Sequence, residues 1–98
     1  MDAVTKAVSG GIGMRHIIKL REEFADAVVN GDKTFEVRLN DRGYQKGDTV
    51  KFRVVTTMGI EFYHEINEME FEITYVLNGW GLKDGYVAFA IKRIMDAE

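Results

Sequence analysis

The chain has 98 residues, a formal net charge of −3 at pH 7 and no cysteine. That length suits one domain, and 46% hydrophobic with 30% charged residues is typical of a globular protein. Without cysteine, disulfides, thiolate metal sites and a cysteine nucleophile are excluded. No apolar run approaches the roughly 20 residues that cross a bilayer, and the first residues lack the apolar stretch of a secretory signal. The sequence therefore predicts a cytoplasmic protein with no membrane partner.

The charges are distributed unevenly along the chain. Residues 14–53 contain nine basic and seven acidic side chains, whereas residues 54–76 contain five glutamates and no lysine or arginine. Nucleic-acid binding requires clustered cations, because phosphates must be neutralised. A net acidic protein can still carry one basic face. A local contact with nucleic acid is therefore compatible with this composition, but binding by bulk electrostatics is not.

The N-terminal residues differ in pattern from the rest of the chain. Residues 1–13 contain several glycines and no sustained hydrophobic period, which predicts a flexible segment. Residues 14–98 are then expected to form a single domain, with no internal repeat or second boundary. Its first segment, residues 14–20, is short and rich in β-branched residues, as in a strand.

Residues 21–30 change to a helical period. Phe24, Ala27 and Val28 stand at i, i+3 and i+4, so we expect them to line one buried face of a helix. Gly31 follows directly. Because glycine adopts the left-handed conformation without strain, it is the usual residue just beyond a helix end.

Residues 33–40 alternate between apolar and polar side chains, which predicts a half-buried strand. Phe35, Val37 and Leu39 are expected to face the core. The opposite, polar face then carries Thr34, Glu36, Arg38 and Asn40. Residues 41–48 are rich in turn-forming residues and would connect this strand to the next.

The second half of the chain predicts further strands separated by turns. The expected strands span residues 50–54, 60–66, 69–75 and 86–94. Gly59 is expected in a hairpin turn, and Trp80 in a glycine-rich loop. One helix supplies too few crossovers for an all-parallel sheet. The predicted fold class is α+β: a small, curved, mostly antiparallel β-barrel with one main helix packed against it.

A family resemblance appears at residues 31–38, which read Gly-x-Lys-x-x-Glu-x-Arg. This run resembles the signature of ASCH domains, a branch of the PUA-like superfamily. Residues 14–48 and 73–87 look like an uncharacterised bacterial and phage ASCH-like group. The resemblance implies a PUA-like barrel in which the helix and the motif strand border a polar cleft. It also implies RNA binding or recognition of a modified nucleotide.

The polar residues of this motif form the candidate site. On a strand, Glu36 and Arg38 share a face and lie roughly 6–7 Å apart along the backbone, with Lys33 nearby. Arginine offers a planar fork to a phosphate or a base edge, and a carboxylate accepts from an exocyclic amine. The alternative is a solvated ion pair between Glu36 and Arg38 that contributes less than about 1 kcal/mol to stability.

Four further residues could extend or border this site. Asn40 and Arg42 could continue its polar rim, or serve as a turn residue and a surface charge. Trp80, together with Tyr86, could stack on a base or cap the end of the barrel. His16 is expected to be a hydrogen-bonded structural residue. No histidines and carboxylates share a metal-binding spacing, so neither a metal nor another cofactor is predicted.

Three functions follow, in order of preference. The first is a module that binds RNA or a modified nucleotide beside Lys33, Glu36 and Arg38. The second is a small amidohydrolase of an acylated nucleoside, with Lys33 and Glu36 transferring protons. One relative in the resembled superfamily hydrolyses N(4)-acetylcytidine with a lysine and a threonine, and Glu36 occupies the threonine position here. Binding is therefore favoured. The third is a protein-interaction adaptor that uses the acidic residues 54–76.

Overall fold

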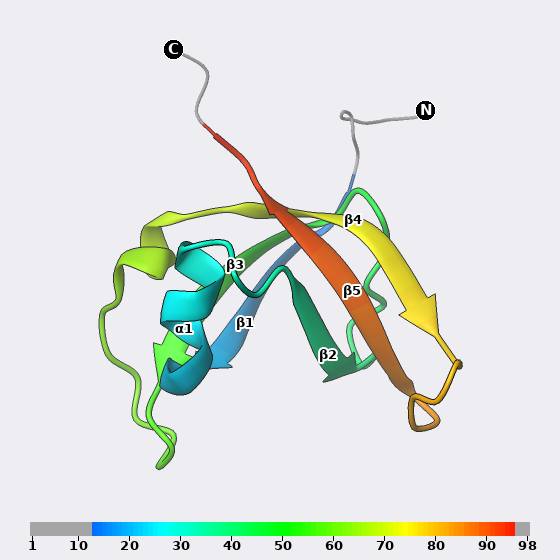
Figure 1. The fold of residues 1–98 in the computed structure, drawn as a ribbon, viewed down its shortest axis with the longest axis horizontal. Coiled ribbons are helices and arrows are strands. Elements are labelled where there is room, and N and C mark those ends of the chain that lie inside the picture. The colour runs from blue at the N-terminus through cyan, green and yellow to red at the C-terminus, as the bar shows by residue number, and fades with distance from the viewer. Residues whose placement is uncertain (1–12, 96–98) are drawn as a thin grey trace.

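The strands form one strongly curved sheet, and a single α-helix packs against one side of it (Figure 1). The computed structural model describes residues 13–95. In chain order the elements are β1 (Arg15–Arg21), α1 (Glu22–Val29), β2 (Phe35–Leu39), β3 (Thr49–Val55), the 3-10 helix η1 (Glu65–Glu68), β4 (Phe71–Asn78) and β5 (Tyr86–Arg93). The expected flexible segment, residues 1–13, lies outside the described residues apart from Gly13.

The strand order across the sheet is β1-β3-β4-β5-β2. β1 pairs with β3 in parallel, and the other three pairings are antiparallel. The α+β class and the mostly antiparallel sheet are therefore confirmed. β1 and β2 are the two edges, and no backbone ladder joins them within residues 13–95. The closed barrel predicted from the sequence is not confirmed.

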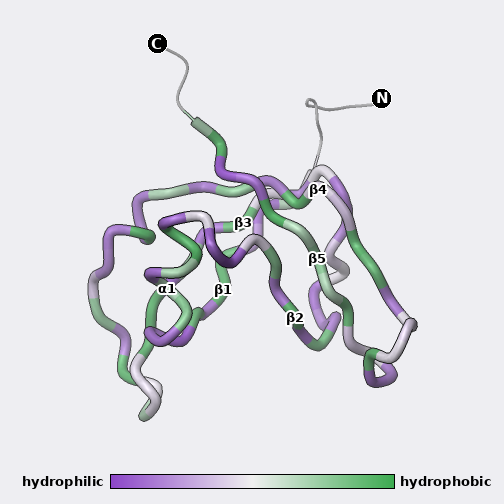
Figure 2. Tube along the Cα trace, viewed as in Figure 1, coloured by the Kyte–Doolittle hydropathy of each residue, from purple (hydrophilic) through white to green (hydrophobic). Residues whose placement is uncertain are grey.

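Strand alternation builds the core. Val50, Phe52 and Val54 on β3 are buried, as their alternation with Lys51 and Arg53 predicts, and so are the inward residues of β5, Val87, Phe89 and Ile91. Hydrophobic and hydrophilic residues accordingly alternate along much of the sheet (Figure 2). Full burial of one such aliphatic or aromatic side chain contributes about 1.5–3 kcal/mol. No helix among the described residues is long and apolar enough to cross a membrane.

The helix buries a different face from the predicted one. Ala25 and Val28 are buried, whereas Phe24 is 38% exposed and Ala27 is only half-buried. The helix face that packs on the core therefore centres on Ala25 and Val28, and Phe24 lies beside it. Phe24 also lines a groove between the two edge strands of the sheet, β1 and β2.

The strand predicted at residues 60–66 is wrong. The turn before it forms, with Gly59 at φ 83°, but pairing beyond it is limited to one bridge between Val55 and Glu61. The chain then enters η1, where the His64 ring accepts from the Ile66 amide and the Asn67 side chain accepts from the His64 amide. Such local bonds satisfy the backbone without a ladder and compete with strand formation.

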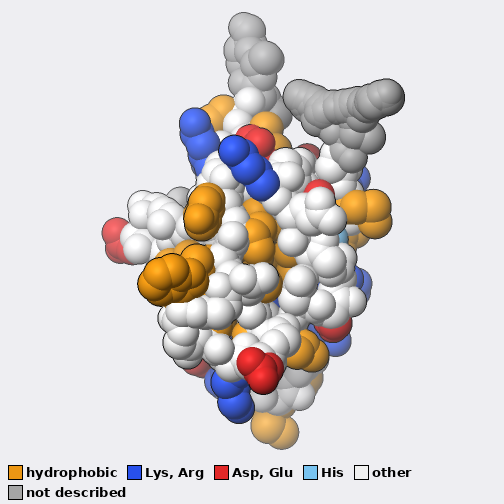
Figure 3. Space-filling view, turned by 90° about the vertical axis from the view of Figure 1, so that its right-hand side faces the viewer, with side chains coloured by type: hydrophobic (Ala, Val, Ile, Leu, Met, Phe, Trp, Pro, Cys, Tyr) orange, Lys and Arg blue, Asp and Glu red, His pale blue; other side chains and the backbone are white. Residues whose placement is uncertain are grey.

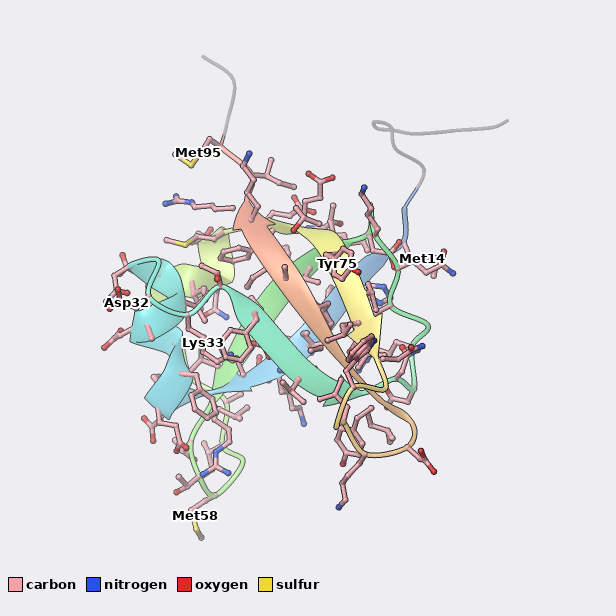
Figure 4. The ribbon with its side chains drawn as sticks, turned by 45° about the vertical axis from the view of Figure 1, so that its right-hand side comes forward. Met14, Asp32, Lys33, Met58, Tyr75 and Met95 are labelled. Atoms are coloured by element: carbon pink, nitrogen blue, oxygen red, sulfur yellow. The ribbon has the colours of Figure 1, made fainter. Side chains whose placement is uncertain are left out.

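One side chain of β4 departs from the predicted alternation. Phe71 and Ile73 face the core, but Tyr75, which the period-two pattern of residues 69–75 predicts on the same face, is 63% exposed (Figure 4). The β4–β5 register shifts between Ile73 and Tyr75. A bulge of this kind inserts one unpaired residue and reverses the faces of the residues that follow it.

Candidate functional site

The end of α1 fixes the backbone of Lys33. Gly31 has φ 86°, and its amide donates to the Val28 carbonyl at 3.2 Å. The Ala27 carbonyl accepts from the Asp32 and Lys33 amides, each at 2.9 Å. The first two of these bonds are the pair that defines a Schellman helix end, so the predicted role of Gly31 is confirmed. Asp32 points away from the domain, whereas Lys33 lies between α1 and β2 (Figure 4).

Glu36 lies at the centre of the predicted cluster. Its side chain is buried, and each of its carboxylate oxygens accepts a hydrogen bond from a different cation. Lys33 Nζ lies 2.7 Å from Oε2, and Arg38 Nε lies 3.0 Å from Oε1. A buried carboxylate is costly unless it is paired and hydrogen-bonded in this way. The structure thus brings Lys33, Glu36 and Arg38 together.

The faces of β2 are the reverse of those predicted. Glu36 faces inward with 3% of its surface exposed, whereas Phe35, Val37 and Leu39 are about half exposed, at 49%, 50% and 50%. The inward position is tolerated because Lys33 and Arg38 accompany the carboxylate. On an edge strand, alternation alone does not determine which face is covered.

Two aromatic rings border Lys33. Its ammonium lies 5.2 Å from the ring centre of Phe24 and 4.9 Å from that of Phe35, and it also donates to the Phe35 carbonyl at 2.7 Å. Cation–π contacts at such distances stabilise a cation by about 0.5–1 kcal/mol when partly exposed. Lys33 is therefore held in place by α1 and β2 together.

Arg38 joins the two edges of the sheet. Besides its bond to Glu36, it donates from Nη2 to the backbone carbonyl of Lys19 on β1. We call the gap between the β1 and β2 edges the seam. At this point the seam is bridged by a side chain, because no backbone ladder crosses it among the described residues.

A groove of about 880 Å³ lies along the seam, and we call it the seam groove. One side of the groove is formed by outward side chains of β1 and β3, and the opposite side by the outward face of β2. Glu36, Arg38 and Tyr44 also line it. Only two acidic side chains line it, Glu36 and Asp41, against six basic ones: Lys19, Arg21, Lys33, Arg38, Arg42 and Arg53. The groove is thus locally positive in a chain whose net charge is −3.

Tyr44 is a groove residue that the sequence reasoning missed. It is 4% exposed, and its ring centre lies 4.7 Å from those of His16 and Phe89. Burial raises the pKa of the Tyr44 hydroxyl above its ordinary value of 10.0, so the group stays a neutral donor. A large aromatic residue in the turn-rich connection after Asn40 was the available signal for it.

The remaining predicted residues divide into two groups. Arg42 is exposed and lines the seam groove. Tyr86 is half-buried and also lines it. Asn40 instead uses its side-chain oxygen to accept from the Tyr44 amide at 2.9 Å, which is the turn role considered as its alternative. By this bond it helps to position Tyr44.

Trp80 does not line the seam groove. It is 88% exposed at φ 54°, between Gly79 and Gly81, so its alternative role of capping a barrel end is wrong. Figure 3 shows the side of the molecule that carries β4 and the β4–β5 loop. Hydrophobic side chains are exposed over the middle of that face, and Lys and Arg lie mainly toward its upper and lower ends.

His16 has the structural role that was expected. It is buried, and its Nε2 lies 2.8 Å from Asp48 Oδ2. Asp48 also accepts from the backbone amides of Met14 and Gln45, each at 3.0 Å. Across residues 13–95 no three His, Cys, Asp or Glu side chains are grouped so that they could hold a metal ion.

Comparisons with known proteins identify a family and a structural neighbour. The model of the family described as "Domain of unknown function (DUF3850)" matches residues 15–91, and the chain belongs to that family. A crystal structure described as hypothetical protein PH0355 is 19% identical, with a TM-score of 0.56, over 83% of this chain and 100% of that chain. The similarity shows a shared fold. No curated protein matches the chain.

Proposed function

We propose that this domain binds RNA or a modified nucleotide in the seam groove. The observation that carries the proposal is the arrangement around Glu36, whose buried carboxylate holds Lys33 and Arg38 within one groove. Cations that are already fixed lose little conformational entropy when they bind an anion, and preorganisation of this kind favours affinity.

The side chains that line the groove suit the two parts of a nucleotide, its base and its phosphate. Phe35, Val37 and Leu39 expose apolar surface on which a base can lie. Lys19 and Arg42 lie on the same groove and can neutralise phosphate. Arg38 has five N–H donors, of which Glu36 and the Lys19 carbonyl use two. The remaining donors can reach a phosphate or a base edge.

The Gly-x-Lys-x-x-Glu-x-Arg run supports the same proposal through its resemblance to ASCH domains of the PUA-like superfamily. In this proposal the curved sheet is a PUA-like barrel that is closed at the seam by Arg38 rather than by a backbone ladder. The binding site and the closure of the barrel would then depend on the same side chain.

Hydrolysis of an acylated nucleoside is less well supported. Lys33 Nζ already donates to the Glu36 carboxylate and to the Phe35 carbonyl, each at 2.7 Å, so both contacts use it as a hydrogen-bond donor rather than as a base. Both oxygens of Glu36 already accept hydrogen bonds from cations.

The adaptor function also loses support. The glutamates of residues 54–76 do not share one sheet face, since Glu65 and Glu68 belong to η1 and only Glu72 lies on β4. These acidic side chains therefore form no single strand surface for a protein partner.

Binding of short RNAs and nucleosides, measured by titration calorimetry, tests the proposal. Arg38→Ala is expected to weaken binding at least about tenfold, because loss of a charge-assisted contact costs about 1.5–3 kcal/mol. Arg42→Ala tests the groove without touching the Glu36 cluster and is expected to weaken binding about threefold or more. Lys92→Ala on β5, which does not line the seam groove, is the control.

The wild-type chain failing to bind any of these ligands would contradict the proposal, as would unchanged affinity in both groove variants. Circular dichroism of each variant separates loss of binding from loss of folding. Acylated cytidines incubated with the wild-type chain test the second function, because turnover would favour the amidohydrolase over the binding module.

A further inference from the structure

A second groove adjoins the seam groove on the outer face of β1 and β3. It encloses about 680 Å³, and we call it the outer groove. Ile17 and Arg53 line both grooves. The two hollows therefore meet at the outward side chains of these strands.

The register of β1 and β3 explains the basic character of this face. The strands run in parallel, and Ile17 is opposite Lys51 while Lys19 is opposite Arg53. Residues of the same parity share one face of a strand, so the outward side chains form two adjacent rows. Their five basic members are Arg15, Lys19, Arg21, Lys51 and Arg53.

Aromatic and apolar side chains lie among these cations. Tyr63 is 69% exposed, Phe62 is 38% exposed, and both line the outer groove with Ile17, which is 48% exposed. Rings that remain open to solvent beside cations are the arrangement on which single-stranded nucleic acids stack.

Three cations of this face are already partnered, and one of them, Arg21, donates to Glu23 at 3.1 Å. Arg53 makes a bidentate pair with Glu61, at 2.6 and 2.7 Å, and Arg15 lies 3.5 Å from Glu70. The Glu61 pair orients the Arg53 guanidinium at the junction of the two grooves. Lys51 has no ion-pair partner among the residues that the structure describes, which leaves it as the cation best placed to neutralise a phosphate in the outer groove.

We propose that the seam groove and the outer groove form one continuous track for single-stranded RNA. The proposal rests on nucleotide binding in the seam groove and extends it from one nucleotide to a strand. β1 alone spans seven residues, and at about 3.3 Å per residue it offers about 20 Å of track. Phosphates follow the cation rows, and bases lie on the outward apolar and aromatic side chains.

The test compares ligand lengths on the full chain. The probes are random-sequence RNAs of two, four and eight nucleotides and an equimolar mixture of the four nucleoside 5′-monophosphates. Affinity is expected to rise at least about tenfold from the monophosphates to the octamer, since site sizes on single-strand-binding domains begin at about four nucleotides.

Two variants separate the outer groove from the seam groove. Lys51→Ala is expected to weaken octamer binding and to reduce the slope of log affinity against log salt by about 0.7, the value for one phosphate contact on a single strand. Tyr63→Ala is expected to weaken octamer binding about fivefold or more through lost stacking. Neither change is expected to alter monophosphate binding, and Lys92→Ala is the matched charge control.

The following outcomes would contradict the proposal of a continuous RNA track. Equal affinity for monophosphates and octamer, with both weakened by Arg42→Ala, would leave nucleotide binding in place and reject the extended site. Octamer affinity that is unaffected by both Lys51→Ala and Tyr63→Ala would do the same. A DNA octamer that binds as tightly as the RNA octamer would reject RNA as the occupant. If no ligand binds at all, the track and the proposed function fail together.

Discussion

Arg38 on β2 donates a hydrogen bond to the backbone carbonyl of Lys19 on β1, and so links the two edge strands of the sheet. The same guanidinium binds the Glu36 carboxylate on its own strand. Edge strands expose unpaired backbone groups that invite association with other chains. Here the Arg38 side chain satisfies one unpaired backbone carbonyl of the β1 edge, and the same side chain lines the seam groove.

Glu36→Gln is expected to lower the free energy of unfolding by about 1–3 kcal/mol. The substitution keeps the shape of the side chain but leaves Lys33 and Arg38 close together without their shared counter-charge. The expected loss of stability is smaller than for a fully buried ion pair, because both cations retain some contact with solvent. Urea denaturation measures the change. Glu72→Gln, on the exposed face of β4, is the control, and equal stability of the two variants would contradict the account.

Asp48→Ala is expected to destabilise the domain by about 2–4 kcal/mol. Three donors lose their acceptor at once: the Met14 amide, the Gln45 amide and the ring of His16. Thermal unfolding followed by circular dichroism measures the loss. Asp84→Ala, at an exposed loop position, removes the same charge with an expected effect within about 0.5 kcal/mol. A similar melting temperature for both variants would show that the Asp48 network contributes little.

Tyr44→Phe is expected to change how stability depends on alkaline pH. Burial raises the pKa of the Tyr44 hydroxyl in the folded chain above its ordinary value of 10.0. The unfolded chain therefore ionises first as the pH rises, and the stability contributed by the neutral hydroxyl, complete below pH 10, is lost above it. From about pH 9 to about pH 11 the wild-type chain should lose more unfolding free energy than the variant. Urea titrations at both pH values measure this, and a constant difference between the two proteins would contradict it.

Trp80 is expected to remain accessible when a nucleotide occupies the seam groove. It is the single tryptophan of the chain, it is 88% exposed, and it does not line the groove. Acrylamide should therefore quench its fluorescence to the same extent in the free and the ligand-bound protein. Protection of the indole by a bound mononucleotide would instead bring Trp80 into the site, as the sequence had suggested.

Local periodicity was sufficient for much of the fold. The helix and its end at Gly31, and the inward faces of β3 and β5, follow from patterns within a few residues, because the backbone geometry of helices and strands imposes those periods. Residues 60–66 were misread because side chain to backbone bonds within the segment outweighed its apolar content.

The candidate site, like the fold, was predictable from the sequence only in part. The spacing of Lys33, Glu36 and Arg38 permitted a compact polar cluster, and the structure brings the three side chains together, but with Glu36 on the buried face. Tyr44 and Lys19 could not be assigned from spacing. They reach the groove through contacts between segments far apart in the chain.

By itself, the sequence determined which residues alternate and where the charges cluster. Only the tertiary structure decided that Glu36 faces inward while Phe35, Val37 and Leu39 face out. It also decided that the cations of β1 and β3 stand side by side. The physical reason is that alternation specifies two faces of a strand but not which one is covered. That choice depends on what the rest of the chain packs against each face, and here Lys33 and Arg38 pair with the inward carboxylate.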